Sequence, residues 1–129
     1  MLAREYGGDG KIRGRCGESE KPLVAFPAHL APNALLCYTG GQFPEKYKNG
    51  AFIAFHGSWN RAPEPQAGYF VAFVPMKDGK PGGNWEIFAD GFAGGDDKKA
   101  SGRVDYRPCG LAQGPDGALY VSDDRKGNI

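Results

Sequence analysis

The sequence lacks any long apolar run and any concentration of basic residues. No stretch approaches the roughly 18 apolar residues of a membrane-spanning helix, and the N-terminus has no apolar centre of a signal peptide. Sixteen basic residues oppose fifteen acidic ones, which gives a net charge of +1 without a basic stripe. These absences argue against a membrane span and against nucleic acid as a partner.

Cysteine is scarce as well. With three cysteines at least one is unpaired, and their spacing matches neither a metal-binding CxxC pair nor a haem-attachment motif. Cys37, inside the apolar run ALLCYT, is expected to be a small buried side chain. Cys16 lies in a polar, glycine-rich segment and is expected to have lost a partner. No metal site is predicted, because Asp96, Asp97, Asp123 and Asp124 are typical of solvated acidic turns.

Glycine and proline are abundant, with 21 and 10 residues, whereas 40% hydrophobic and 12% aromatic residues argue against disorder. Short apolar runs alternate with turn dipeptides such as Asn49-Gly50 and Asp116-Gly117. The pattern predicts an all-β chain. One short helix is expected at 43–48 and a flexible loop at 94–102. The predicted strands are 23–26, 34–39, 51–56, 69–75, 85–89, 109–113 and 118–122.

Two segments resemble distant copies of each other: PxxLAPNALLCYTG from Pro27 and RPCGLAQGPDGALYVSDD from Arg107. Each runs from a polar residue through Leu-Ala and a turn to an apolar strand, which predicts equivalent inner strands. With the strands between them, one repeat would hold four antiparallel strands. That is the composition of a β-propeller blade.

Polar side chains gather beside several of these strands. The run AFIAFHGSWNR (51–61) delivers His56, Trp59 and Arg61 to one strand end, His29 lies in FPAHLAPN, and Arg107 lies in DYRPCGL. This arrangement predicts a shared site.

The order of these motifs resembles a known family. LAPNALLCYTGGQFPEKYKNGAFIAFHGSWNR, GYFVAFVPMKDGKPGGNWEIFADGF and YRPCGLAQGPDGALYVSDD look like the C-terminal part of sorbosone dehydrogenase-like proteins, relatives of the soluble quinoprotein glucose dehydrogenases. The resemblance runs from about Gly14 to the end. It implies a six-bladed β-propeller that oxidises sugars or aldehydes with pyrroloquinoline quinone (PQQ) held over the central shaft, outside the cell or in the periplasm.

The resemblance also implies that the chain is only part of such a propeller, one and a half to two blades. A polar segment would occupy 1–22 and the partial propeller 23–129, with a complete blade at about 27–92 and an incomplete one at about 103–129. Blade edges carry unpaired backbone groups and need neighbours. We therefore expect the remaining blades or a homo-oligomer as partner.

The family's site residues can be carried over by position. The cofactor has three carboxylates, so cationic and hydrogen-bonding side chains suit it. The catalytic base and the calcium ligands of the family come from earlier blades, so the catalytic residues stay unknown and calcium belongs to the full-length protein. The expected cofactor-binding residues are His29, His56, Arg107 and Trp59, with Asn60 and Arg61 at the substrate rim.

Each assignment has a structural alternative. The two histidines could satisfy backbone groups at strand ends, and Trp59 could close a core. Arg107 could form a surface ion pair with Asp105 or Asp124.

Two other functions stay open. The chain could be a non-catalytic propeller fragment that binds a partner or assembles with itself. Less favoured is a propeller hydrolase of the lactonase or esterase type, because Ser58 lies in no GxSxG motif.

Overall fold

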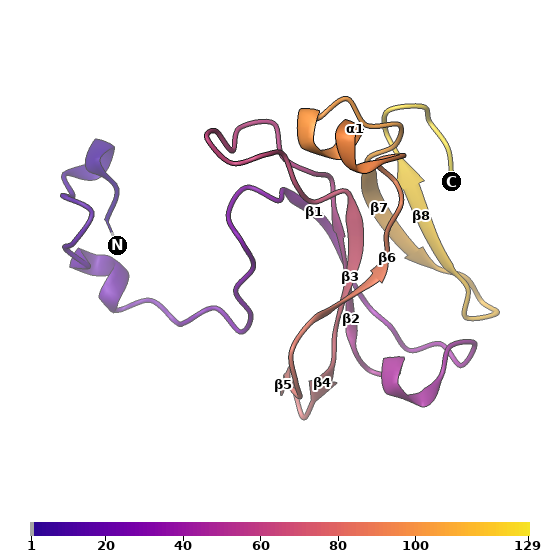
Figure 1. Ribbon diagram of the computed structural model, residues 1–129. Helices are drawn as coiled ribbons and strands as arrows, with labels where there is room; N and C mark the ends of the chain where they lie inside the picture. Colours follow the sequence, from indigo (N-terminus) through magenta and orange to yellow (C-terminus); the bar gives the residue numbers. More distant parts are fainter. Residues whose placement is uncertain (1) are drawn as a thin grey trace.

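The fold is built from antiparallel strands, as the sequence predicts (Figure 1). The computed structural model describes residues 2–129, apart from the side chain of Cys16, so the prediction for that thiol lies outside the described residues. The main sheet has four antiparallel strands in the order β1-β2-β3-β6. These strands are β1 (Pro32–Cys37), β2 (Ala51–Phe55), β3 (Phe70–Val74) and β6 (Glu86–Ala89).

Two hairpins complete the strands. The hairpin of β7 (Pro108–Gln113) and β8 (Leu119–Asp123) lies beside the main sheet, and the short ribbon of β4 (Met76–Lys77) and β5 (Lys80–Pro81) extends from β3 (Figure 1). The helical elements are η1 (Arg4–Tyr6), η2 (Gly14–Gly17), η3 (Glu45–Tyr47) and α1 (Asp96–Ser101). Among residues 2–129, no helix is long and apolar enough to cross a membrane.

Several predictions are wrong in detail. Residues 23–26 form no strand, because no neighbouring strand pairs with them. The loop predicted at 94–102 contains helix α1, and the helix predicted at 43–48 is the single 3-10 turn η3. The two sequence copies are not equivalent, since the first contributes β1 and the second contributes both β7 and β8. The described residues form one four-stranded sheet and two hairpins, which agrees with the predicted antiparallel strands, and they show no propeller.

Both faces of the main sheet are covered, which explains why every residue of β2 and β3 is buried. On the first face, Phe55 and Phe70 pack with Phe26 and Leu30 from the segment before β1. On the second face, an aromatic cluster packs against the β7–β8 hairpin. The buried members of this second-face cluster are Tyr38, Phe52, Val71 and Phe73. Phe43, Tyr47, Phe88, Ala89 and Phe92 pack against them, as do Leu111, Leu119 and Val121 from the hairpin.

Hydrogen bonds fix the turn end of the hairpin to the sheet. The buried Tyr38 hydroxyl donates to the Gly117 carbonyl at 2.7 Å. The Gln113 side-chain oxygen accepts from the backbone N–H groups of Thr39 and Gly40, at 2.9 and 3.0 Å. The hairpin is therefore held by polar contacts as well as by apolar packing.

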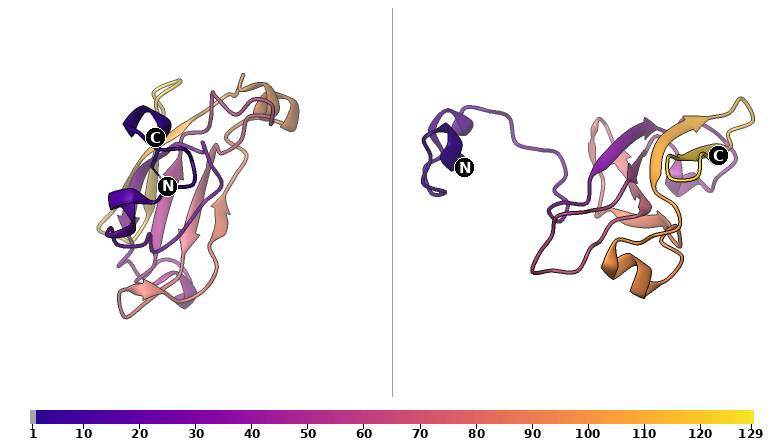
Figure 2. Two further views of the ribbon diagram at one scale, coloured as in Figure 1. Left: turned by 90° about the vertical axis from the view of Figure 1, so that its left-hand side faces the viewer. Right: turned by 90° about the horizontal axis from the view of Figure 1, so that it is seen from above.

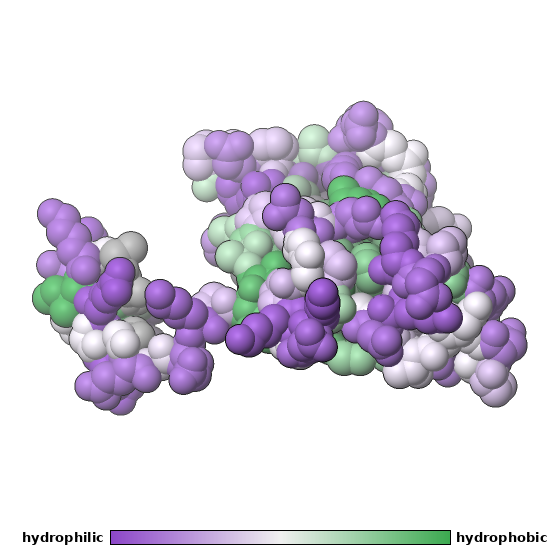
Figure 3. Space-filling view, turned by 90° about the horizontal axis from the view of Figure 1, so that it is seen from below, coloured by the Kyte–Doolittle hydropathy of each residue, from purple (hydrophilic) through white to green (hydrophobic). Residues whose placement is uncertain are grey.

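The N-terminal segment lies apart from this body. It stands away from the sheets, joined by an extended stretch, in Figure 1 and in the right-hand view of Figure 2. The coloured surface of this segment is mainly hydrophilic (Figure 3). On the sheet itself, β1 is an edge strand, and Leu35 is 65% exposed on the first face. Cys37 lies on the same face and is exposed, so the prediction of a buried Cys37 is wrong.

We predict that Tyr38→Phe lowers the free energy of unfolding by about 1–2 kcal/mol, because it leaves the Gly117 carbonyl without its donor. Urea denaturation measures this loss. Tyr120→Phe is the matched control, since the Tyr120 ring is 48% exposed and its hydroxyl makes no hydrogen bond within residues 2–129. Equal effects of the two substitutions would contradict the account.

Candidate functional site

The predicted site residues meet where β2 ends. The His56 N–H donates to the Ala31 carbonyl at 2.9 Å, and the Gly57 N–H donates to the Leu30 carbonyl at 3.1 Å. These bonds continue the pairing of β1 with β2 and bring the turn that carries His29 beside His56. His29 and Ala31 have φ angles of 61° and 54°, a left-handed conformation that is uncommon for residues other than glycine. Such backbone strain is frequent at binding sites.

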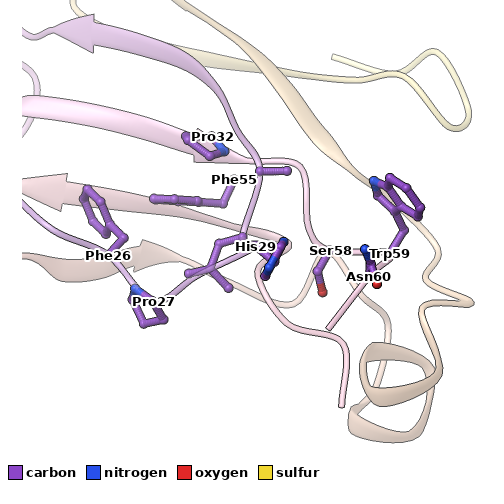
Figure 4. A pocket seen from close by; sticks show the side chains of 10 residues that line it. Phe26, Pro27, His29, Pro32, Phe55, Ser58, Trp59 and Asn60 are labelled. Atoms are coloured by element: carbon purple, nitrogen blue, oxygen red, sulfur yellow. The ribbon is translucent and has the colours of Figure 1, made fainter. Parts of the chain in front are cut away.

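A cavity of about 590 Å³ opens beside this turn, on the first face of the sheet. The close view shows Phe26 and Pro27 on one side and Trp59 and Asn60 on the other, with His29 between them (Figure 4). The volume is typical of small-molecule pockets. Trp59 is 82% exposed, so it does not close a core.

Arg107 lies at the same sheet end but outside the lining of the cavity. Its Nη1 donates to the carbonyls of His56 and Gly57, at 3.5 and 3.3 Å, and its Nη2 donates to the Gly102 carbonyl at 3.3 Å. Its guanidinium carbon lies 5.1 Å from the centre of the Tyr69 ring. Arg107 thus joins the hairpin to the main sheet.

The ion pairs considered for Arg107 do not form. Asp105 pairs with Lys98 at 2.7 Å, and Asp124 pairs with His56. Within the described residues, the Arg107 guanidinium has no carboxylate partner. Its contacts occupy at most three of the five guanidinium N–H groups, so at least two remain for a ligand.

His56 has a partner that the sequence did not reveal. Its Nε2 lies 3.0 Å from both carboxylate oxygens of Asp124, in the segment that follows β8. Because the two residues are 68 positions apart, no local sequence pattern indicates this contact.

Ser58 closes the loop that presents Trp59, Asn60 and Arg61. Its N–H donates to the Ala67 carbonyl and its Oγ accepts from the Ala67 N–H, both at 2.8 Å. The Tyr69 hydroxyl donates to the Ser58 carbonyl at 2.6 Å. Ser58 is 1% exposed, so its hydroxyl is a structural group and the hydrolase alternative has no accessible nucleophile here. In the same loop, Arg61 donates to the Pro65 carbonyl at 2.8 Å.

Asp123 is buried, contrary to the prediction of a solvated turn for this residue. Its carboxylate accepts the backbone N–H groups of Arg107, Lys126 and Arg125 at 2.6, 2.8 and 3.1 Å. Burial by itself raises the pKa of Asp123. The three hydrogen bonds together lower the pKa by more than burial raises it, so the pKa lies below its usual value of 3.8. No group of three His, Cys, Asp or Glu side chains in the described part of the chain could hold a metal.

The site therefore has two parts. The cavity part contains an exposed aromatic ring, an imidazole and an amide, from Trp59, His29 and Asn60. The hairpin part contains the Arg107 guanidinium and the His56–Asp124 pair. Aromatic and amide groups suit a ring-shaped polar ligand, and an unpaired guanidinium suits an anion.

Comparisons with known proteins identify the relatives of the chain. The TrAA12-like family model matches residues 11–129. A PQQ-dependent pyranose dehydrogenase of Coprinopsis cinerea is 32% identical over 123 residues, covering 84% of the chain and 16% of that protein. An uncharacterized protein of Borreliella burgdorferi is 34% identical over 103 residues, covering 79% of the chain and 25% of that protein.

Solved structures show a similar fold. The calcium structure of a Trichoderma reesei carbohydrate-active enzyme of family AA12 has a TM-score of 0.71 at 24% identity, covering 94% of the chain and 29% of that chain. The iodide structure of the Trichoderma reesei family AA12 enzyme has a TM-score of 0.52 at 25% identity. The match covers 62% of the present chain and 20% of that chain. The chain thus spans less than a third of the length of each of these proteins.

These matches correct one expectation and support another. The assignment to the sorbosone dehydrogenase-like and soluble glucose dehydrogenase proteins is wrong, because the family that matches nearly the whole chain is TrAA12-like. The expectation of a quinone cofactor is supported by a relative, since the Coprinopsis protein is named as PQQ-dependent.

We predict that Gly57→Ala destabilises the fold by about 2–5 kcal/mol. Gly57 has a φ of 93°, and an added Cβ would collide with the buried Tyr69 ring. Gly79→Ala is the matched control, with a φ of 75° and no atom within 4 Å, and should cost about 1 kcal/mol. Thermal or urea unfolding compares the two. A similar cost for both would show that the contact with Tyr69 is unimportant.

The lowered pKa of Asp123 predicts a dependence of stability on pH. The ionised carboxylate stabilises the fold above pH 3.8, and this contribution is lost as the pH falls through the lower pKa of the folded state. The difference in unfolding free energy between the wild type and Asp123→Asn should be constant from pH 5 to 7 and shrink below about pH 4. Urea titrations at each pH measure it, and a difference that grows on acidification would contradict the assignment.

Proposed function

The chain belongs to the TrAA12-like family, and on that premise we propose that it forms one wall of the cofactor site of a PQQ-dependent sugar oxidoreductase acting on pyranoses. The observation that carries the proposal is the cavity at the end of β2, where Trp59 is 82% exposed beside His29 and Asn60. Similarity to the Coprinopsis pyranose dehydrogenase over 84% of the chain supports it.

The residues fit part of the cofactor. PQQ has a planar ring system and three carboxylates, whereas the described site end offers the Arg107 guanidinium, which has no carboxylate partner among the described residues, together with the exposed Trp59 ring. These groups suit one carboxylate and one ring face. The remaining carboxylates would need cations from other parts of the protein. When bound, the quinone supplies the acceptor for the two electrons removed from a sugar.

Arg107 would hold the anionic edge of the ligand, and His56 would add a hydrogen bond from Nδ1 when its ring is protonated. The Arg107 guanidinium is fixed by three backbone carbonyls, so its remaining N–H groups are preorganised for a carboxylate. Fixing the guanidinium beforehand reduces the entropy that binding costs. His56 lies beside Arg107, with its own backbone carbonyl bonded to that guanidinium.

Trp59, His29 and Asn60 would bind the ring face and the sugar. An exposed indole provides a flat apolar surface, while the imidazole and amide provide hydrogen bonds. Arg61 would complete the substrate rim beside Asn60. The loop closure by Ser58 holds this set together without the ligand.

The propeller remains part of the proposal. We propose that residues 27–92 form one blade and residues 103–129 part of the next, with 1–22 as a separate segment. The packing of the β7–β8 hairpin on the second face of the main sheet supports adjacent blades. The other blades, the catalytic base and any calcium site would belong to the rest of such a protein. Its proposed location is periplasmic or extracellular.

A second candidate function rests on the exposed first face of β1. Leu35 is 65% exposed there beside Cys37, so this edge could serve a binding or self-assembling module without catalysis. Light scattering tests this second function by comparing the molar mass of Leu35→Asp with that of the wild type, because a charge at this position should dissociate an oligomer.

We predict that Trp59→Ala weakens the binding of PQQ by about tenfold, because an aromatic contact contributes about 1–1.5 kcal/mol. Equilibrium dialysis of the chain with PQQ and calcium measures the dissociation constant. Tyr6→Ala is the matched control, since Tyr6 is a 70% exposed aromatic residue in the remote N-terminal segment. Binding that is unchanged by Trp59→Ala would refute the role of Trp59, and no binding to the wild type would refute the proposed function of the chain.

A further inference from the structure

We propose that Asp124 is a positioning residue that orients the His56 ring and leaves Nδ1 as the ring nitrogen available to a ligand. In this pair, the His56 Nε2 lies 3.0 Å from both oxygens of the Asp124 carboxylate. The ligand's identity rests on the proposed function, but the orientation of the ring does not.

The Asp124 carboxylate is held in place by its neighbour. Asp123 accepts three backbone N–H groups, including those of Arg125 and Lys126, and this fixes the turn on which Asp124 lies. The Asp123 N–H also donates to the Asn128 carbonyl at 2.9 Å. The turn is thus bonded on both sides of Asp124.

The His56 ring is restrained from the other side by the main sheet. Its backbone N–H donates to the Ala31 carbonyl, and its carbonyl accepts from Arg107. The side chain is only 23% exposed, so few ring orientations are open to it. The hydrogen bond between Nε2 and the Asp124 carboxylate then selects one of these ring orientations.

This contact determines the tautomer. A carboxylate oxygen accepts hydrogen bonds, so Nε2 must carry the proton and donate it. In the neutral ring, Nδ1 then has the free lone pair. No described residue forms a hydrogen bond with Nδ1. His56 therefore offers a ligand an acceptor at Nδ1 when neutral and a donor there when protonated.

The chain has only two histidines, which makes the test direct. Nitrogen-15 NMR of the labelled chain, at a pH where both rings are neutral, reports which nitrogen of each ring carries the proton. We expect His56 to be fully protonated at Nε2, with a slowly exchanging imidazole N–H resonance. That resonance should be lost in Asp124→Ala and restored in Asp124→Glu, while His29 serves as the internal reference.

Asp96→Ala is the matched control, because it removes an exposed carboxylate at the start of α1 and should leave the His56 signals unchanged. Identical His56 spectra in the wild type and Asp124→Ala would overturn the inference.

In a second arm, PQQ should shift the His56 Nδ1 signal in the wild type and bind about tenfold more weakly to Asp124→Ala. If PQQ shifts no signal, the proposed cofactor is wrong, whereas the expected imidazole signature still supports the orienting role. Equal PQQ affinity of the two proteins would overturn the role of Asp124 toward that ligand.

Discussion

The packing of the β7–β8 hairpin on the second face of the main sheet is the contact on which the rest of the structure depends. Without it, the apolar cluster on this face would lose the cover that Leu111, Leu119 and Val121 provide, on a sheet whose central strands are apolar on both faces. The hairpin is held at its turn by Tyr38 and at its open end by Arg107. Because Arg107 bonds to the end of β2, the same contact that stabilises the fold also shapes the candidate site.

The sequence motif HGSWNR is largely explained by this arrangement. Gly57 leaves room for the buried Tyr69 ring, and Ser58 closes the loop through its bonds with Ala67. Besides His56, the residues that follow Ser58 are the ones of this motif that are available to a ligand, and Trp59 is the most exposed aromatic side chain of the main body. The motif therefore combines structural residues with candidate binding residues, and Arg61 is partly bound to its own loop.

Apolar runs between turn dipeptides predicted six of the eight strands. The signal is strongest for β2 and β3, because a strand buried on both faces has a continuous apolar sequence. The same signal failed at 23–26, where the apolar residues cover the first face as an irregular segment. The meeting of His29, His56 and Arg107 at one sheet end was predictable, because each lies beside a strand. The pairing of His56 with Asp124 was not, because it depends on how the hairpin sits on the sheet. The short motifs also indicated the wrong family, although they indicated the right kind of cofactor in a relative.

The central claim is that the sheet end formed by the turn before β1, the end of β2 and the start of β7 binds the quinone. Hydrogen–deuterium exchange of the chain, with and without PQQ, tests it most directly, because bound ligand protects the backbone that it covers. The account predicts protection within 27–31, 56–61 and 105–107 and little change in the β4–β5 ribbon. Protection confined to other segments would contradict it.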